Sequence, residues 1–165
     1  MIKVVESIVV YIGEKVAYLN VLLILLIGVD VTFRYIFDSS KNWILELEWH
    51  LFALIFLMGS AYALQAGKHV RVDLFYNKFS DKTKATIDIL GTLLFLIPWC
   101  IVVMKTSWIF VESSWYMKEG SPNPGGLPAR YLIKGSIILA FGILMIQGFA
   151  ILFKELSKFK NNQWK

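Results

Sequence analysis

Four long apolar runs dominate this chain of 165 residues. They cover approximately residues 16–35, 47–66, 89–108 and 135–153. A helix of about 20 residues is about 30 Å long, which matches the hydrocarbon thickness of a bilayer. The sequence therefore predicts an all-α integral membrane protein, with four transmembrane helices in a single membrane domain over residues 1–165.

The composition supports a membrane protein. Hydrophobic residues make up 57% of the chain and charged residues only 18%, whereas soluble domains are usually about half apolar and about a quarter charged. The net charge of +5 could suggest nucleic acid as a partner, but the basic residues gather in connections and tails, as membrane topology requires. We therefore expect no nucleic-acid binding. The first run has no cleavage site after it, so it is expected to remain as a signal anchor.

The distribution of lysine and arginine predicts the orientation. Four spans put both termini and the connection between the second and third spans on one side of the membrane. That side carries most of the basic residues outside the runs, and basic residues favour the cytoplasm. We therefore expect both termini to be cytoplasmic, in a multi-pass protein of the bacterial inner membrane.

The connections carry their own signals. The segment 70–79 has helical apolar periodicity and is predicted to be a short amphipathic helix on the inner surface. Ser80 is a candidate N-cap for the third helix, and Pro98 is expected to kink that helix. The segment 119–130 is rich in proline and glycine, which favours an ordered or extended outer loop rather than a helix.

Two polar positions lie near the first connection. Asp30 and Arg34 are four residues apart in the first run, so they share a helix face and are expected to pair. Glu46 opens the second helix, where a carboxylate meets the positive end of the helix dipole. Capping of that helix and pairing with Arg34 both remain open for Glu46. Trp43 marks the membrane interface.

The second helix also carries small residues and a histidine. Gly59, Ala63 and Gly67 follow at intervals of four, and such a stripe allows close approach of another helix, either within the chain or from a partner. His50 and His69 are 19 positions apart, or about 28 Å along one helix, so they cannot ligate one haem. The sequence holds no recognisable nucleophile–base pair, metal-ligand spacing or phosphate loop, and we expect no enzyme activity, metal or cofactor.

The segment from Arg34 to Asp73 resembles a known family. It combines Arg34-Tyr35 at the end of the first helix, Trp43-x-x-Glu46 at the start of the second, and "GKHVRVD" at residues 67–73. With "GLP" at 126–128 and the layout of four spans, nearly the whole chain is similar to the small membrane (DctQ-like, or Q) subunit of tripartite ATP-independent periplasmic (TRAP) transporters.

The resemblance implies a non-catalytic scaffold. Such a subunit forms a heterodimer with a larger, elevator-type membrane subunit that carries the substrate and sodium sites. A periplasmic binding protein delivers an organic anion, usually a carboxylate, for sodium-coupled uptake. Membrane lipids are the remaining expected partners.

Within that picture, several residues become candidates for structural or interface roles. They are Arg34, Trp43, Glu46, Gly59, Ala63, Gly67, His69, Arg71 and Asp73. One hypothesis is an intersubunit or interhelical Arg34–Glu46 ion pair that fixes the first two helices. A second is that His69, Arg71 and Asp73 anchor the inner connection against lipid headgroups or the large subunit.

A third hypothesis is that the outer loop, with Lys118, Glu119 and Arg130, touches the docked binding protein.

Two other functions compete with the scaffold interpretation. A self-contained small transporter would need a transport carboxylate, for which Asp30 is the candidate. A redox membrane anchor would need paired histidines on different helices.

Overall fold

The computed structural model describes residues 2–67 and 79–160. Every regular element within these ranges is helical. The elements are α1 (Ile2–Ile36), α2 (Asn42–Gln65), α4 (Asp81–Gly91), a π-helical turn η1 (Thr92–Leu96), α5 (Ile97–Tyr116) and α6 (Arg130–Lys160).

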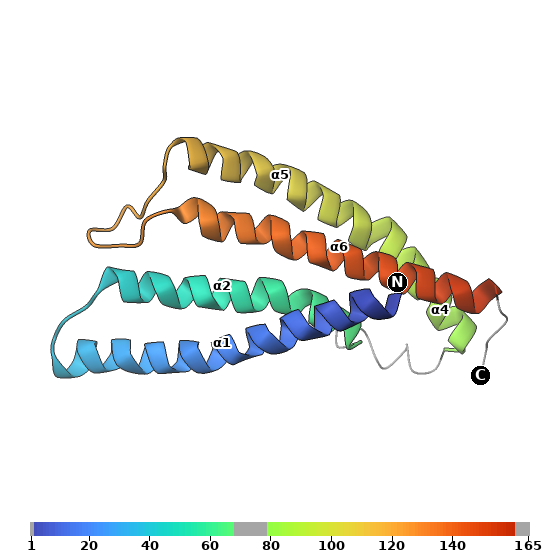
Figure 1. The fold of residues 1–165 in the computed structure, drawn as a ribbon, viewed down its shortest axis with the longest axis horizontal. Helices are drawn as coiled ribbons and strands as arrows, with labels where there is room; N and C mark the ends of the chain where they lie inside the picture. The colour runs from blue at the N-terminus through green and yellow to red at the C-terminus, as the bar shows by residue number, and fades with distance from the viewer. Residues whose placement is uncertain (1, 68–78, 161–165) are drawn as a thin grey trace.

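Four helical segments of the described chain are long and apolar enough to cross a membrane: α1, α2, the continuous segment Asp81–Tyr116 and α6. The prediction of an all-α protein with four spans is therefore confirmed. Figure 1 shows the α1–α2 and α5–α6 connections at one end of the bundle, which we call the loop end, and the start of α1 and the end of α6 toward the other. That the loop end faces away from the cytoplasm stays a prediction from the charge distribution.

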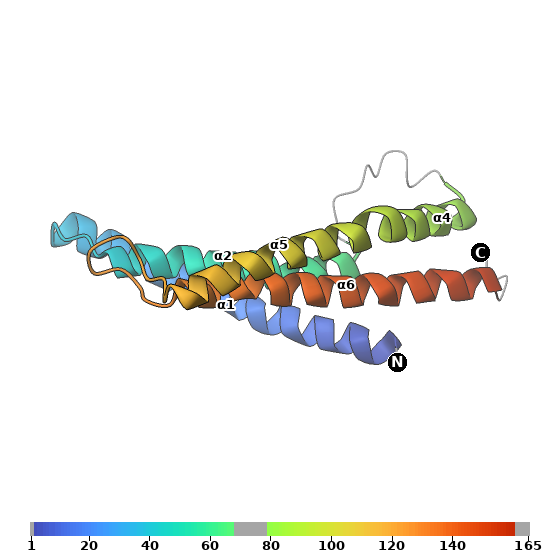
Figure 2. The same cartoon turned by 90° about the horizontal axis from the view of Figure 1, so that it is seen from above.

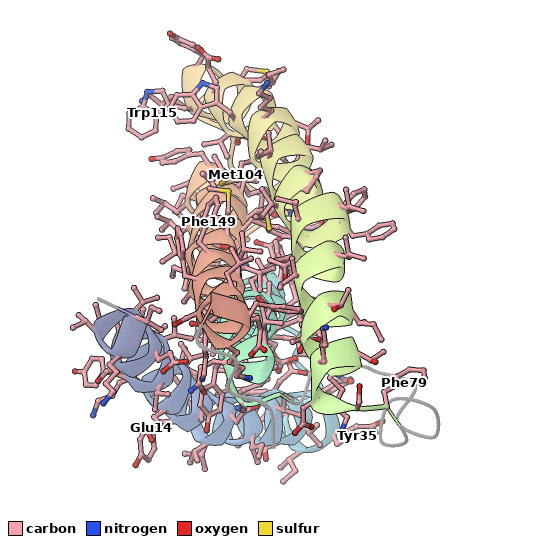
Figure 3. The ribbon with its side chains drawn as sticks, turned by 90° about the vertical axis from the view of Figure 1, so that its right-hand side faces the viewer. Glu14, Tyr35, Phe79, Met104, Trp115 and Phe149 are labelled. Carbon is pink, nitrogen blue, oxygen red and sulfur yellow. The ribbon has the colours of Figure 1, made fainter. Side chains whose placement is uncertain are left out.

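Helix α6 is the centre of the bundle. It contacts α1, α2, α4 and α5, and the end-on view in Figure 3 shows it between the α1–α2 hairpin and the α4–α5 segment. Figure 2 shows α4 running close to the last turns of α6. The buried apolar cluster comes from four helical segments and consists of Val9, Ala61, Leu64, Cys100 and Leu144. Most other large apolar side chains point outward, as expected for helices surrounded by hydrocarbon.

The third span is interrupted where Pro98 predicts a disturbance. The backbone N–H of Ile97 donates to the carbonyl of Thr92, so the chain makes a π-helical turn directly before the proline. A proline lacks a backbone donor and crowds the preceding turn, and a π-turn is one way a helix absorbs such a local defect. The predicted N-cap is confirmed, because the Ser80 side chain accepts a hydrogen bond from the N–H of Thr83 at 3.3 Å.

The predicted amphipathic helix cannot be compared with the structure over most of its length. Residues 70–78 lie outside the described residues, and only Phe79 of the predicted segment 70–79 falls within them.

Helices α1 and α2 lie close together at Gly13. A Cβ atom placed on Gly13 would lie only 2.4 Å from Cγ of Tyr62, so the two helices touch because this position has no side chain. The small-residue stripe on α2 is arranged differently. A Cβ on Gly59 would meet nothing within 4 Å, and Gly67 has a φ of +66°, a left-handed conformation that suits glycine just after a helix end.

We predict that Gly13→Val destabilises the protein by about 1–3 kcal/mol, because the added branch would displace the ring of Tyr62 near its root. The matched control is Gly28→Val on the same helix, where nothing lies within 4 Å of an added Cβ. Thermal unfolding in detergent would measure both. Equal melting temperatures for the two variants would show that the Gly13–Tyr62 contact does not matter.

Candidate functional site

The loop between α5 and α6, residues 117–129, folds back over the start of α2. It is closed by two backbone hydrogen bonds, from the N–H of Ser121 to the carbonyl of Leu127 and from the N–H of Arg130 to the carbonyl of Glu119, both at 2.9 Å. The side chain of Asn42 donates to the carbonyl of Pro124 at 2.9 Å. The loop therefore has a defined conformation that is fastened to the other hairpin.

Glu46 accepts most of the hydrogen bonds between the loop and α2. Its Oε1 accepts from the Ser121 hydroxyl, from Nδ2 of Asn123 at 3.2 Å and from the guanidinium of Arg130 at 3.4 Å. Its Oε2 accepts from the backbone N–H of Leu127 at 2.6 Å. Only 3% of Glu46 is exposed. We call Glu46 and these four donors the Glu46 network.

Gly126 is required by this arrangement. A Cβ atom at Gly126 would lie 2.3 Å from Oγ of Ser121 and 2.8 Å from Oε2 of Glu46. Because real Cβ atoms do not approach that closely, any side chain at this position would displace the loop from the carboxylate. The glycine of the "GLP" segment thus allows the loop backbone to reach Glu46.

The prediction of an ion pair between Arg34 and Glu46 within the chain is wrong, because each residue pairs with a different partner. Arg34 pairs instead with Asp30 on its own helix, as the spacing of four residues predicts, and Asp30 is 2% exposed. Glu46 pairs with Arg130. The reason is that the 117–129 loop covers the start of α2 and brings four donors to Glu46, while Arg34 already has a buried carboxylate within reach.

A second ion pair fastens the loop to α6. The ammonium of Lys134 donates to the carboxylate of Glu119. This hydrogen bond is the largest cause that holds the pKa of Glu119 below its ordinary value of 4.5, with a further contribution from the Ser114 side chain. Aromatic rings lie under the nearby cations: Nζ of Lys118 is 3.8 Å from the ring centre of Trp115.

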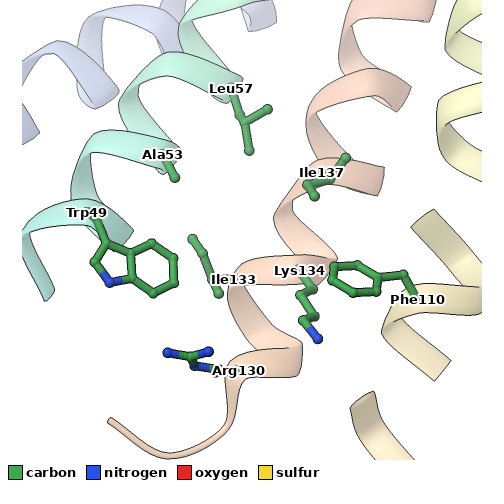
Figure 4. A pocket seen from close by; sticks show the side chains of 8 residues that line it. All are labelled: Trp49, Ala53, Leu57, Phe110, Arg130, Ile133, Lys134 and Ile137. Atoms are coloured by element: carbon green, nitrogen blue, oxygen red, sulfur yellow. The ribbon is translucent and has the colours of Figure 1, made fainter. Parts of the chain in front are cut away.

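A cleft of about 270 Å³ lies beside the Glu46 network, between α2, α5 and α6 (Figure 4). Its lining is Trp49, Ala53, Leu57, Phe110, Arg130, Ile133, Lys134 and Ile137. Figure 4 shows Trp49 and Arg130 toward one end and Leu57 and Ile137 toward the other. The cleft is thus apolar along its length and cationic at its rim.

The other sequence candidates within the described residues are not part of this site. Trp43 lies exposed in the first turn of α2, and Gly59 and Ala63 lie further along the same helix. His69, Arg71 and Asp73 are outside the described residues.

Sequence reasoning missed Ser121, Asn123 and Leu127 as partners of Glu46. The "GLP" segment beside them was the available signal, but it does not indicate which helix the loop contacts.

Comparison with known proteins bears directly on this region. The family model described as tripartite ATP-independent periplasmic transporters, DctQ component, matches residues 23–158. The chain belongs to the DctQ family. The match includes α2, the 117–129 loop and nearly all of α6, so the Glu46 network lies within the part shared with the family. Comparison with curated proteins gives no match. The resemblance to a TRAP small membrane subunit is confirmed.

For this DctQ-family chain we predict that Glu46→Gln lowers the free energy of unfolding and loosens the 117–129 loop. The amide nitrogen of glutamine would face donors instead of accepting from them, and the half-buried guanidinium of Arg130 would lose its charged partner. Thermal unfolding and the rate of protease cleavage within residues 117–129 would measure the effect. Glu14→Gln, on the exposed face of α1, is the control, and equal behaviour of the two variants would contradict the assignment.

We also predict a pH-dependent contribution of Glu119. Because its pKa in the folded protein is lowered by Lys134, the stabilisation is fully present above the ordinary value of 4.5 and is lost as the pH falls through the lowered pKa. The difference in melting temperature between wild type and Glu119→Gln should therefore be constant near neutral pH and shrink below pH 4.5. If the difference in melting temperature grew on acidification, the proposed stabilisation by ionised Glu119 would be contradicted.

Proposed function

We propose that this DctQ-family chain is the non-catalytic scaffold subunit of a sodium-coupled TRAP transporter that takes up organic anions, with carboxylates as the expected class. In this proposal it pairs with the large permease subunit in the bacterial inner membrane, and a periplasmic binding protein delivers the anion. The large subunit carries out the sodium-coupled transport itself.

The observation that supports a scaffold most directly is where the charged groups lie. In the described residues the buried carboxylates are Asp30, Glu46 and Glu155, and each has a cationic partner: Arg34, Arg130 and Lys158. All three carboxylates lie in the outer turns of their helices, within eight residues of an element end. An ion pathway would instead favour charged groups facing one another at mid-membrane.

The outer surfaces of the helices support a partner within the membrane. Large apolar side chains remain exposed along α1, for example Tyr18 at 70%, Ile24 at 68% and Leu25 at 62%. In a bilayer such surfaces are covered by lipid or by the helices of another subunit. A small bundle with most of its apolar area facing outward suits a subunit that widens a larger membrane body.

The loop end supports a contact with the binding protein. The Glu46 network and the Lys134–Glu119 pair hold the 117–129 loop in one conformation, so its outer surface is preorganised for docking. Met117, exposed at 68%, and Lys118 lie on this loop. We propose that this loop faces the periplasm and forms part of the platform on which the binding protein docks.

A reconstitution experiment tests the proposed function. On this proposal, a large multispanning permease from the same organism should co-purify with this chain. Proteoliposomes that contain both chains should take up the anion held by the cognate binding protein only under an inward sodium gradient. Proteoliposomes with this chain alone, or with potassium in place of sodium, are the controls. Uptake by this chain alone, or equal uptake in potassium, would exclude the scaffold role or the sodium coupling respectively.

A further inference from the structure

We infer that the cleft between α2, α5 and α6 at the loop end binds one membrane phospholipid. The phosphate lies at Arg130 and Lys134, and one acyl chain lies along the apolar wall. This site is distinct from the transport function proposed above, since it needs only this chain and a bilayer.

The length and lining of the cleft fit an acyl chain. Trp49, Ala53 and Leu57 follow one another at intervals of four on α2, and Ile133 and Ile137 face them from α6 (Figure 4). The eight residues between Trp49 and Leu57 correspond to about 12 Å of depth, less than half of the hydrocarbon thickness of about 30 Å. The cleft therefore runs within a single leaflet. Its volume of about 270 Å³ is just below the lower end of small-molecule sites, about 300 Å³.

The rim of the cleft offers unused hydrogen-bond donors. A guanidinium has five N–H groups and an ammonium three. Arg130 reaches Glu46 through one terminal nitrogen, and its Nε is buried with no acceptor among the described residues. Lys134 donates to Glu119 and retains further N–H groups. The oxygens of a phosphodiester are the natural acceptors for such charged donors.

The surroundings of the two cations match a membrane interface. Cζ of Arg130 lies 5.8 Å from the ring centre of Trp49, and Nζ of Lys134 lies 3.8 Å from that of Phe110. Tryptophan is enriched where headgroups meet hydrocarbon. A ligand with an anionic head and an apolar tail complements both parts of the cleft, whereas a small soluble anion would leave the apolar wall unused.

The first experiment fills the cleft without touching its charges. Ala53→Phe adds a ring to the wall, and Ala17→Phe makes the same change on the exposed face of α1. Native mass spectrometry of the full chain, purified in mild detergent, should show one retained phospholipid for wild type and Ala17→Phe. For Ala53→Phe we expect retention to fall about tenfold, because the acyl chain loses its packing surface. Leu57→Trp, with Phe56→Trp on the exposed face as its control, gives the same comparison if Ala53→Phe does not fold.

The second experiment identifies the headgroup contact and the source of the phosphate. Delipidated protein is titrated with phosphatidylglycerol that carries brominated acyl chains, which quench tryptophan at short range. Lys134→Gln should weaken the quenching curve about tenfold through loss of a charged donor, and Lys105→Gln on the exposed face of α5 should leave it unchanged. Trp49→Phe should remove most of the saturable quenching. Inorganic phosphate should not displace the lipid.

Three results would overturn the inference. The first is equal phospholipid retention by Ala53→Phe and Ala17→Phe, which would mean that retained lipid lies elsewhere on the surface. The second is displacement by inorganic phosphate, which would make the ligand a soluble anion. The third combines two observations: wild type retains no phospholipid, and Ala53→Phe no longer binds the large subunit. Together they would mean that a side chain of the large subunit occupies the cleft.

Discussion

The structure depends on one buried carboxylate at the start of α2. A buried carboxylate is costly without hydrogen-bond donors, and the 117–129 loop supplies three of the donors that Glu46 needs. The donors come from positions 75 to 84 residues further along the chain. The carboxylate thus joins the α1–α2 hairpin to the α5–α6 hairpin at the loop end, where the hydrogen bond from Asn42 to the carbonyl of Pro124 is a further polar link. In a membrane, apolar packing gains little from exclusion of water, so this polar contact fixes how the two hairpins meet.

The opposite end of the bundle is held by different means. Nζ of Lys154 in α6 lies 2.9 Å from Oε1 of Glu6 in α1, and Gly13 lets α1 approach Tyr62 of α2. Between the two ends, α6 contacts every other helix of the described chain. Tying both ends and packing the middle on one helix gives a rigid body. Rigidity is what a scaffold subunit needs if a larger partner moves against it.

Local features of the sequence predicted local features of the structure. The apolar runs predicted the number of spans, the spacing of Asp30 and Arg34 predicted their pairing, and Ser80 caps the helix that follows it. Each of these depends on residues within a few positions of one another. The partners of Glu46 could not be found in this way, because they are set by the path of a proline- and glycine-rich loop and include a backbone N–H, that of Leu127, which has no sequence signature. Arg34 was the nearest cation in sequence and the wrong one in space. The cleft required three helices to be placed, so no single segment indicated it.

Arg130 connects the two features of the loop end. Its guanidinium is a donor to Glu46 and also part of the rim of the cleft. A phosphate bound there, as inferred above, would hold Arg130 in the orientation that also serves Glu46, so lipid binding and loop closure would each favour the other. Thermodynamic linkage makes this coupling reciprocal. Opening of the loop weakens lipid binding by a certain factor, and loss of the lipid shifts the loop toward its open state by the same factor. The surface proposed to receive the binding protein would then be stabilised by the membrane that surrounds it, and the carboxylate of Glu46 would be the group through which the two are coupled.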